Sequence, residues 1–227
     1  MKMYSKIYSL VVAAMLFASC GEASSSNKIA ASADGPGKGG VRKINLVAPK
    51  GKAIAAFAEG CFWCSEEIFE DVAGVDSVIS GYSGGNVPNP TYEKVSTGTT
   101  GYAESVLVYY DPKKVSYPEL LKVFYASHDA TTQDRQGPDE GTQYRSVVFY
   151  ANPTEKALAE TAKTDALKSG MFQRAIVTQI VPLKEFYRAE EYHQNYAKHN
   201  QDNPYIQNVS QQRFEQFKKT YKGKLKP

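Results

Sequence analysis

Two cysteines lie where a predicted strand gives way to a predicted helix. Residues 60–64 read Gly-Cys-Phe-Trp-Cys, so Cys61 and Cys64 stand three positions apart with two aromatic residues between them. A short apolar stretch, residues 53–58, precedes them, and apolar residues at helical spacing follow over residues 62–72. No cysteine occurs after Cys64, so any thiol chemistry of the folded domain must use this pair.

Strand and helix signals alternate along the chain from about residue 52. Apolar and β-branched runs predict the strands, and the capping residues Ser116 and Asn152, each close to a proline, predict two helix starts. This order predicts an α+β fold, a single domain in which a mixed β-sheet packs against helices, similar to an α-β plait. The predicted strands cover residues 53–58, 75–79, 105–110, 144–150 and 175–181, and the predicted helices cover residues 62–72, 117–125 and 153–170, with a polar loop at 128–143.

The first 19 residues have the features of a signal peptide. Two lysines precede an apolar stretch, residues 10–18, that is too short to cross a bilayer comfortably. Residues 16–20 read Leu-Phe-Ala-Ser-Cys, which resembles a bacterial lipoprotein signal with Cys20 as the acylated residue; an ordinary cleaved secretory signal is the alternative. We therefore predict export to the bacterial cell envelope, in the periplasm or at the surface, with an N-terminal lipid as the membrane anchor.

Composition divides the rest of the chain into three parts. Residues 20–51 begin with a Ser-, Ala- and Gly-rich stretch and are predicted as a flexible tether. Residues 52–210 are predicted as the globular domain, and residues 211–227 as a polar C-terminal tail. The net charge is +3 without a long basic stretch, so the composition does not favour nucleic-acid binding.

The spacing of the two thiols suits redox chemistry. Side chains three positions apart on a helix have Cβ atoms ~5–6 Å apart, close to the ~3.5–4.5 Å that a disulfide requires. Cys61 would lie at the N-terminal end of the helix, where free N–H groups favour a thiolate. The pair therefore predicts one attacking and one resolving sulfur.

Three other kinds of site use the same spacing. A zinc site needs two more ligands, and the chain has three histidines and no second cysteine pair. In a thioredoxin-like exchanger the tryptophan precedes the first cysteine, whereas Phe62 and Trp63 lie between the two here. A structural disulfide would close a very small loop and gain little entropy. Two large rings beside a reactive sulfur are better suited to wall a pocket for an apolar group.

Six blocks of sequence resemble those of a known family. Residues 60–63 resemble the signature of the A-type peptide-methionine sulfoxide reductases. Further blocks follow in the order of that family: 81–85 (Gly-Tyr-Ser-Gly-Gly), 88–92 (Pro-Asn-Pro-Thr-Tyr), 100–104 (Thr-Gly-Tyr-Ala-Glu), 135–146 (Arg-Gln-Gly-Pro-Asp-Glu-Gly-Thr-Gln-Tyr-Arg-Ser) and 189–194 (Ala-Glu-Glu-Tyr-His-Gln). The resemblance covers roughly residues 52–205 and predicts that residues 52–210 are a methionine sulfoxide reductase domain.

The resemblance implies a repair enzyme that reduces the S epimer of methionine sulfoxide in oxidised proteins or as the free amino acid. Cys61 would attack the sulfoxide sulfur and become a sulfenic acid, Glu104 would protonate the oxygen, and Cys64 would then form a disulfide with Cys61. Many relatives carry resolving cysteines near the C-terminus, where this chain has none. A thioredoxin-like donor would reduce the disulfide, and the resemblance implies neither a cofactor nor a metal.

The same resemblance assigns five substrate-binding residues. Phe62 and Trp63 would enclose the S-methyl group of the substrate. Tyr92 and Tyr144 would hydrogen-bond the sulfoxide oxygen, and Asp139 would hold the substrate or its water. Without the resemblance, solvent exposure and packing are the ordinary interpretations of such acids and tyrosines. We expect a monomer, and the alternative functions are an exported disulfide oxidoreductase and a non-catalytic lipoprotein.

Overall fold

The computed structural model describes residues 41–227 of the chain. The predicted signal peptide at residues 1–19, Cys20 and residues 20–40 of the predicted tether lie outside the described residues. Within residues 41–227, no helix is long and apolar enough to span a membrane.

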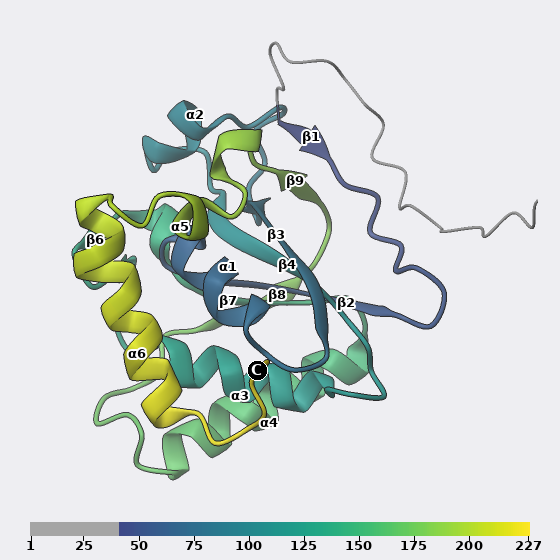
Figure 1. Ribbon diagram of the computed structural model, residues 1–227. Helices are drawn as coiled ribbons and strands as arrows, with labels where there is room; N and C mark the ends of the chain where they lie inside the picture. The colour runs from purple at the N-terminus through teal and green to yellow at the C-terminus, as the bar shows by residue number, and fades with distance from the viewer. Residues whose placement is uncertain (1–40) are drawn as a thin grey trace, which may run out of the picture. The chain divides into compact units, whose positions relative to one another are not determined.

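The domain is built on a seven-stranded sheet with the strand order β1-β9-β3-β4-β2-β7-β8 (Figure 1). Neighbouring strands are antiparallel except β7 and β8, which are parallel. The predicted α+β fold, a single domain with a mixed sheet, is therefore confirmed. The strands of the sheet are β1 (Arg42–Lys43), β2 (Ala53–Glu59), β3 (Val75–Ser83), β4 (Ala103–Tyr110), β7 (Ser146–Tyr150), β8 (Gln179–Pro182) and β9 (Phe186–Arg188), and β5 (Arg135–Gln136) pairs with β6 (Asp139–Glu140) in a separate hairpin.

Helices pack on this sheet, and two of them begin at the predicted capping residues. The Ser116 hydroxyl accepts a hydrogen bond from the Glu119 N–H, and the Asn152 side chain accepts one from the Glu155 N–H. Helix α1 packs on β3 and β4, and α6 packs against α1 and α3 (Figure 1). The helices are α1 (Phe62–Glu70), α2 (Tyr92–Ser96), α3 (Tyr117–Ser127), α4 (Pro153–Lys168), α5 (Tyr196–His199) and α6 (Gln211–Thr220).

Strand β2 lies inside the sheet and is buried on both faces. Its side chains alternate between two hydrophobic clusters, because successive residues of a strand point to opposite faces. Ala55 and Phe57 belong to the larger cluster, where the Phe57 ring stacks on Phe69 with a centroid distance of 5.0 Å. Ala56 and Ala58 belong to the smaller cluster. The strand therefore brings the chain to the first cysteine inside the molecule.

Gly60 allows the chain to turn from β2 into α1. Its φ of +94° is in a region that residues with a Cβ rarely adopt. A Cβ at this position would also lie 2.5 Å from the Cβ of Gln136. The turn brings Cys61 to the N-cap position of α1. The predicted strand-to-helix junction is confirmed.

The C-terminal segment differs from its prediction as a polar tail. Residues 211–220 form α6, in which Phe217 is fully buried, and its ring stacks on Tyr221 with a centroid distance of 5.1 Å. Leu225 then forms a β-bridge with Val72. Because residues four positions apart lie on one face of a helix, a segment that is polar on average can still bury an apolar stripe. The packed domain therefore continues through the predicted tail.

Several other predicted boundaries shift. The predicted helix at 62–72 ends at Glu70, and the predicted strand at 175–181 is replaced by β8, which starts at Gln179. The predicted strand at 144–150 starts at Ser146, because residues 142–144 form a 3₁₀ helix. The predicted loop at 128–143 contains the β5–β6 hairpin. These shifts fall in short or polar stretches, where periodicity carries little information.

Candidate active site

Cys61 and Cys64 lie at the start of α1, directly after the buried strand β2. Cys61 is the N-cap residue and Cys64 lies in the first turn of the helix. Both are free thiols, with 6% and 2% of their surfaces exposed. The first N–H of the helix, that of Phe62, donates a hydrogen bond to Glu104 Oε2 at 3.1 Å. Two sulfurs and one carboxyl group therefore share the N-terminal end of α1.

The two thiols do not ionise equally. The pKa of Cys64 is lowered to about 7, because Cys61 donates a hydrogen bond to its sulfur and the Arg213 guanidinium adds positive charge. Burial raises the pKa of Cys61 well above its usual range, and the neighbouring Cys64 and Glu104 raise it further. The prediction that the helix end favours a thiolate on Cys61 is wrong for the free pair, because burial outweighs the helix end. Of the two thiols, Cys64 is therefore the one whose pKa its surroundings lower.

Glu104 is a buried carboxyl group on β4. Only 2% of its surface is exposed, which excludes the alternative of a solvated glutamate at a strand start. Burial raises its pKa to about 8, the Phe62 N–H partly opposes this shift, and the negative charges of Asp139 and Cys64 add to it. Glu104 therefore keeps its proton at neutral pH and can donate it to a bound group.

The other polar residues of the predicted site surround the same point. Burial raises the pKa of Tyr92 and that of Tyr144, and negative charge on Glu104 and Cys61 raises both further. Both tyrosines therefore lie near these two groups as protonated hydrogen-bond donors. Asp139 belongs to β6, and burial raises its pKa as well.

Aromatic rings line the side of the site next to α1. The Phe62 ring is buried, with its centroid 5.0 Å from that of His193. The half-buried Trp63 stacks on Tyr196 at 3.9 Å, and its indole N–H donates to His193 Nδ1 at 3.1 Å. The Tyr92 ring lies 4.5 Å from His193. These contacts hold the rings in place beside the thiol pair and provide an apolar wall.

The family model for peptide methionine sulfoxide reductase matches residues 53–225, which contain the whole site. This chain belongs to the peptide methionine sulfoxide reductase family. It is therefore an oxidoreductase that reduces methionine sulfoxide, and the predicted family is confirmed.

Relatives cover the domain at substantial identity. The peptide methionine sulfoxide reductase MsrA of Methanosarcina acetivorans is 55% identical over 147 residues, which are 65% of this chain and 78% of the relative. MsrA of Thermus thermophilus is 42% identical over 174 residues, 77% of this chain and 98% of the relative. The structure of methionine sulfoxide reductase A of Corynebacterium diphtheriae aligns with a TM-score of 0.60 at 35% identity, covering 67% of this chain and 77% of that chain.

The fold of this reductase brings the predicted site residues together around the start of α1. Four of them come from the first helix and its N-cap, and the other four come from α2, β4, β6 and the 3₁₀ helix at residues 142–144. The residues are Cys61, Phe62, Trp63, Cys64, Tyr92, Glu104, Asp139 and Tyr144.

Three residues of the C-terminal segment also contact the site of the reductase, and sequence reasoning missed them. The Tyr205 hydroxyl donates to Asp139 at 2.5 Å, and its ring meets the edge of Trp63. The Ser210 hydroxyl lies 3.0 Å from the Cys64 sulfur. Arg213 lies on α6 and adds positive charge near both sulfurs. The apolar spacing of α6 was the one sequence signal that could have indicated a packed segment here.

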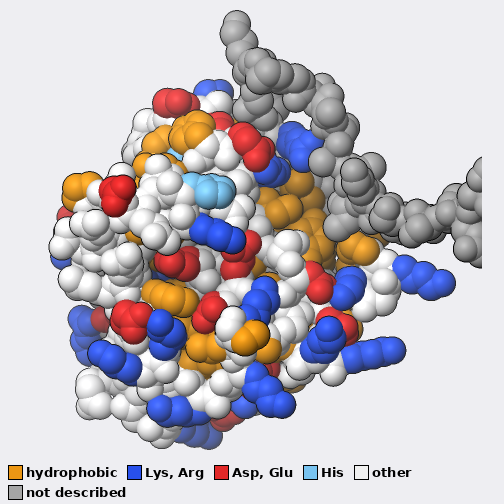
Figure 2. All heavy atoms as spheres, in the orientation of Figure 1, with side chains coloured by type: hydrophobic (Ala, Val, Ile, Leu, Met, Phe, Trp, Pro, Cys, Tyr) orange, Lys and Arg blue, Asp and Glu red, His pale blue; other side chains and the backbone are white. Residues whose placement is uncertain are grey.

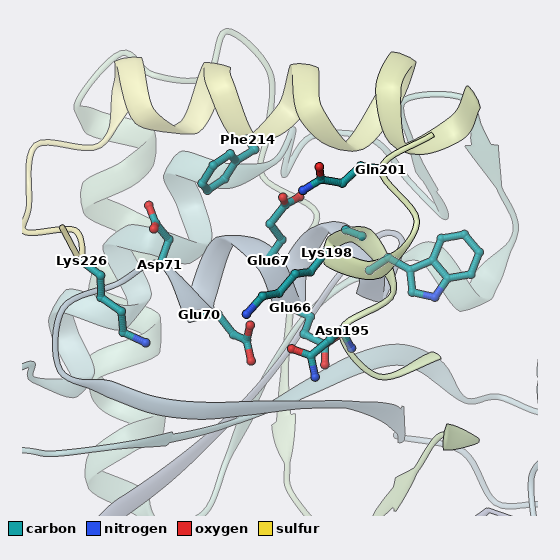
Figure 3. Close-up of a pocket in the computed structure, with 11 residues that line it drawn as sticks. Glu66, Glu67, Glu70, Asp71, Asn195, Lys198, Gln201, Phe214 and Lys226 are labelled. Atoms are coloured by element: carbon teal, nitrogen blue, oxygen red, sulfur yellow. The ribbon is translucent and has the colours of Figure 1, made fainter. Parts of the chain in front are cut away.

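Two cavities border α1 near the thiol pair. A cavity of about 300 Å³ reaches Cys64 and is lined also by the β5–β6 hairpin and by Tyr205 and Arg213. A second cavity, of about 460 Å³, adjoins Trp63 but is not lined by either cysteine. Figure 3 shows acids of α1 facing Lys198 and Lys226 in this second cavity, and Figure 2 shows acidic and basic side chains interspersed over the visible face. Of these two cavities, the one of about 300 Å³ is therefore the one that contacts a sulfur of the thiol pair.

Glu66 is the most buried acid of the second cavity. Its Oε2 accepts a hydrogen bond from the Asn195 N–H at 2.9 Å, while Oε1 has no partner within the described residues. Burial raises its pKa from 4.5 to about 7. The folded protein therefore holds a proton that the unfolded chain has released between these two pH values. This bound proton on Glu66 adds to the free energy of unfolding. The contribution is fully present below pH 4.5 and is lost as the pH rises through 7.

We predict that Glu66→Gln flattens this dependence, because glutamine keeps the hydrogen bond to Asn195 without a charge to bury. The free energy of unfolding should exceed that of the wild type at pH 8 by up to about 3 kcal/mol and should match it within about 0.5 kcal/mol near pH 4.5. Urea unfolding at both pH values measures the difference. The exposed Glu160→Gln serves as the control. An equal effect of Glu66→Gln at both pH values would contradict the prediction.

Proposed function

We propose that this reductase converts the S epimer of methionine sulfoxide, in proteins and as the free amino acid, through Cys61 as nucleophile and Cys64 as resolving thiol. One observation carries the proposal: a protonated carboxyl group, that of Glu104, is tied by a 3.1 Å hydrogen bond to the first N–H of the helix that bears both sulfurs. Sulfoxide oxygen leaves sulfur only after it is protonated. A thiol beside a neutral acid is the arrangement that this reaction requires.

In the first step, the Cys61 sulfur bonds to the sulfoxide sulfur and releases its proton to water. Glu104 protonates the oxygen, which transfers to Cys61 as a sulfenic acid while methionine leaves. The substrate sulfur is reduced by two electrons, and the Cys61 sulfur is oxidised by two.

The surrounding residues have binding roles in this proposal. Tyr92 and Tyr144 donate hydrogen bonds to the sulfoxide oxygen, because their raised pKa values keep both hydroxyls protonated. Phe62 and Trp63 enclose the S-methyl group. Asp139, which already accepts a hydrogen bond from Tyr205, holds the water or the polar end of the substrate.

In the second step, Cys64 attacks the sulfenic acid and a disulfide forms. A dithiol donor of the thioredoxin type then reduces this disulfide and closes the repair cycle. The cavity of about 300 Å³ at Cys64 supports the proposal, because it offers the donor thiol a path to this sulfur that is lined by neither Trp63 nor Tyr92.

We also propose that the enzyme acts in the bacterial cell envelope. The support is the sequence of residues 1–20, with its short apolar stretch and Cys20. Mass analysis of the mature N-terminus tests this proposal. A diacylated or triacylated Cys20 is the expected result, and an N-terminus that still contains residues 1–19 would contradict export.

Cys64→Ser separates the two steps. Pre-reduced wild-type and Cys64→Ser enzymes, mixed with the S epimer without a reductant, should each form about one methionine per enzyme, because the attack does not need the resolving thiol. The wild type should end as a disulfide, and the variant as a sulfenic acid that dimedone traps. Absence of methionine from the wild type would instead favour a disulfide oxidoreductase. A disulfide in the variant would mean that the resolving thiol lies elsewhere.

Glu104→Gln removes the proposed acid but keeps an acceptor for the Phe62 N–H. We expect the rate of methionine formation at pH 7 to fall by about 10²-fold or more, as for other lost general acids. Because the pKa of Glu104 is about 8, the wild-type rate should decline as the pH rises through 8, when the proton is lost. The variant should lack this decline. A pH profile of single-turnover methionine formation measures both effects, and an unchanged rate in Glu104→Gln would remove the acid role.

A further inference from the structure

The Ser210 hydroxyl makes a contact that the proposed cycle has not yet used. Ser210 is fully buried, and its Oγ lies 3.0 Å from the Cys64 Sγ. A serine in a helix commonly donates to the carbonyl four residues before it. Within residues 41–227, however, the Cys64 sulfur is the one hydrogen-bond partner of this hydroxyl. The Ser210 hydroxyl is therefore available to hydrogen-bond the Cys64 sulfur and is not used by the backbone of its own helix.

A local change of helix type aims Ser210 at α1. Residues 206–210 form a π-helical turn, in which the Gln211 N–H donates to the Ile206 carbonyl. Such a turn inserts one residue, and each residue of a helix turns the following part by ~100°. Ser210 and Arg213 are three positions apart and therefore lie on one face. Both residues reach the thiol pair from that face.

Arg213 is held rigidly beside this contact. Its Nη2 lies 2.6 Å from Glu59 Oε1, and its Nε donates to the Ser127 carbonyl at 2.7 Å. Arg213 and Cys64 line the same cavity. The cation is therefore fixed in position near the sulfur and does not have to be recruited during the reaction.

Charged and titratable groups face Cys64 from each neighbouring element. Negative charge on Cys64 is disfavoured by two carboxyl groups and favoured by one cation, by the Cys61 thiol and by the Ser210 hydroxyl. A further neighbour, Tyr205, bonds to Asp139 through its own hydroxyl. The groups are Cys61 at the start of α1, Glu104 on β4, Asp139 on β6, Tyr205 before the π-helical turn and Arg213 on α6.

We propose that Ser210 is a positioning residue for the resolving step, in which its hydroxyl donates a hydrogen bond to the Cys64 thiolate and holds that sulfur for attack on Cys61. This inference rests on the proposed function. In the step, the Cys64 sulfur bonds to the Cys61 sulfur, the S–O bond of the sulfenic acid breaks, and the oxygen leaves as water with the proton that Cys64 had carried. No other reactant is required. The C-terminal segment thus assists the resolving thiol without containing a cysteine itself.

The chemistry of thiolates sets the expected size of the effect. Loss of a hydrogen bond to a thiolate raises the pKa of the thiol, so fewer molecules carry the reactive form below that pKa. A thiolate of higher pKa is intrinsically more nucleophilic, and this partly offsets the decrease in rate caused by the smaller thiolate fraction. Above the pKa, both forms of the enzyme are fully ionised and only the positioning effect remains. The rate of the resolving step should therefore fall most at low pH.

The test is a single turnover of Ser210→Ala, the change that removes the hydroxyl with the least alteration of packing. Pre-reduced enzyme is mixed with the S epimer without a reductant, and samples quenched between pH 5.5 and 9 are assayed for methionine and for free thiols. Trp63, the one tryptophan of the chain, provides a fluorescence signal beside the thiol pair. Ser169→Ala is the matched control, because it removes a hydroxyl at the exposed end of α4.

We expect Ser210→Ala to form methionine within about twofold of the wild-type rate, which also demonstrates that it folds. Disulfide formation should slow by about three- to tenfold at pH 6, and the midpoint of its pH profile should rise by about one unit. Ser169→Ala should match the wild type in both steps. An unchanged rate and midpoint of disulfide formation in Ser210→Ala would overturn the inference. So would an equal loss of both steps, which indicates a structural role. Absence of methionine from the wild type would instead refute the proposed function.

Discussion

The buried carboxyl group of Glu59 joins three parts of the chain directly before the turn that carries the first cysteine. It accepts hydrogen bonds of 2.6 Å from Arg213 on α6 and from the Ser127 hydroxyl at the end of α3. Burial raises its pKa to about 7, and the Arg213 charge opposes this shift. Removal of one partner from such a buried pair costs about 3–5 kcal/mol. The ends of β2 and α3 and the start of α6 are therefore fixed relative to one another at this point.

The environment of the thiols follows from this connection. Arg213 lies three positions after Ser210 on the same helix face, so the pair with Glu59 holds the helix end next to the Ser210–Cys64 contact. Tyr205, one turn earlier in the same segment, contacts Asp139 and Trp63. One C-terminal segment thus contacts both the proposed substrate-binding residues, Asp139 and Trp63, and the resolving thiol of Cys64.

Burial raises the pKa values of both the carboxyl group and the thiols in this site, and only at Cys64 do neighbouring groups outweigh it. It disfavours every negative charge, so Glu104 stays protonated and Cys61 stays a thiol. Cys64 is as deeply buried but has hydrogen-bond donors and a cation around it, so its pKa is lowered. The free enzyme therefore keeps a protonated carboxyl group, that of Glu104, beside the Cys61 thiol. A proton donor next to the attacking sulfur is what a proton-assisted oxygen transfer requires.

Features of this protein that depend on neighbouring residues along the chain could be predicted from its amino-acid order. The apolar run before Gly60, the thiol spacing and the capping residues Ser116 and Asn152 predict β2, α1, α3 and α4, because short-range propensities decide where such elements start. The family blocks indicated the site residues because they retain residue types that the chemistry needs. The hairpin within residues 128–143 was missed, since two-residue strands leave almost no periodic signal.

The difference in pKa between the two sulfurs, and the groups that surround them, depend on contacts between segments far apart in the chain. A helix end favours a thiolate on Cys61, but the burial that reverses this preference comes from segments distant in sequence. Ser210 lies 146 residues from Cys64 along the chain, and no local pattern marks a buried serine as the partner of a sulfur. Propensities act over a few residues, whereas desolvation and charge act across space, so the protonation of this site was determined only when the chain had folded.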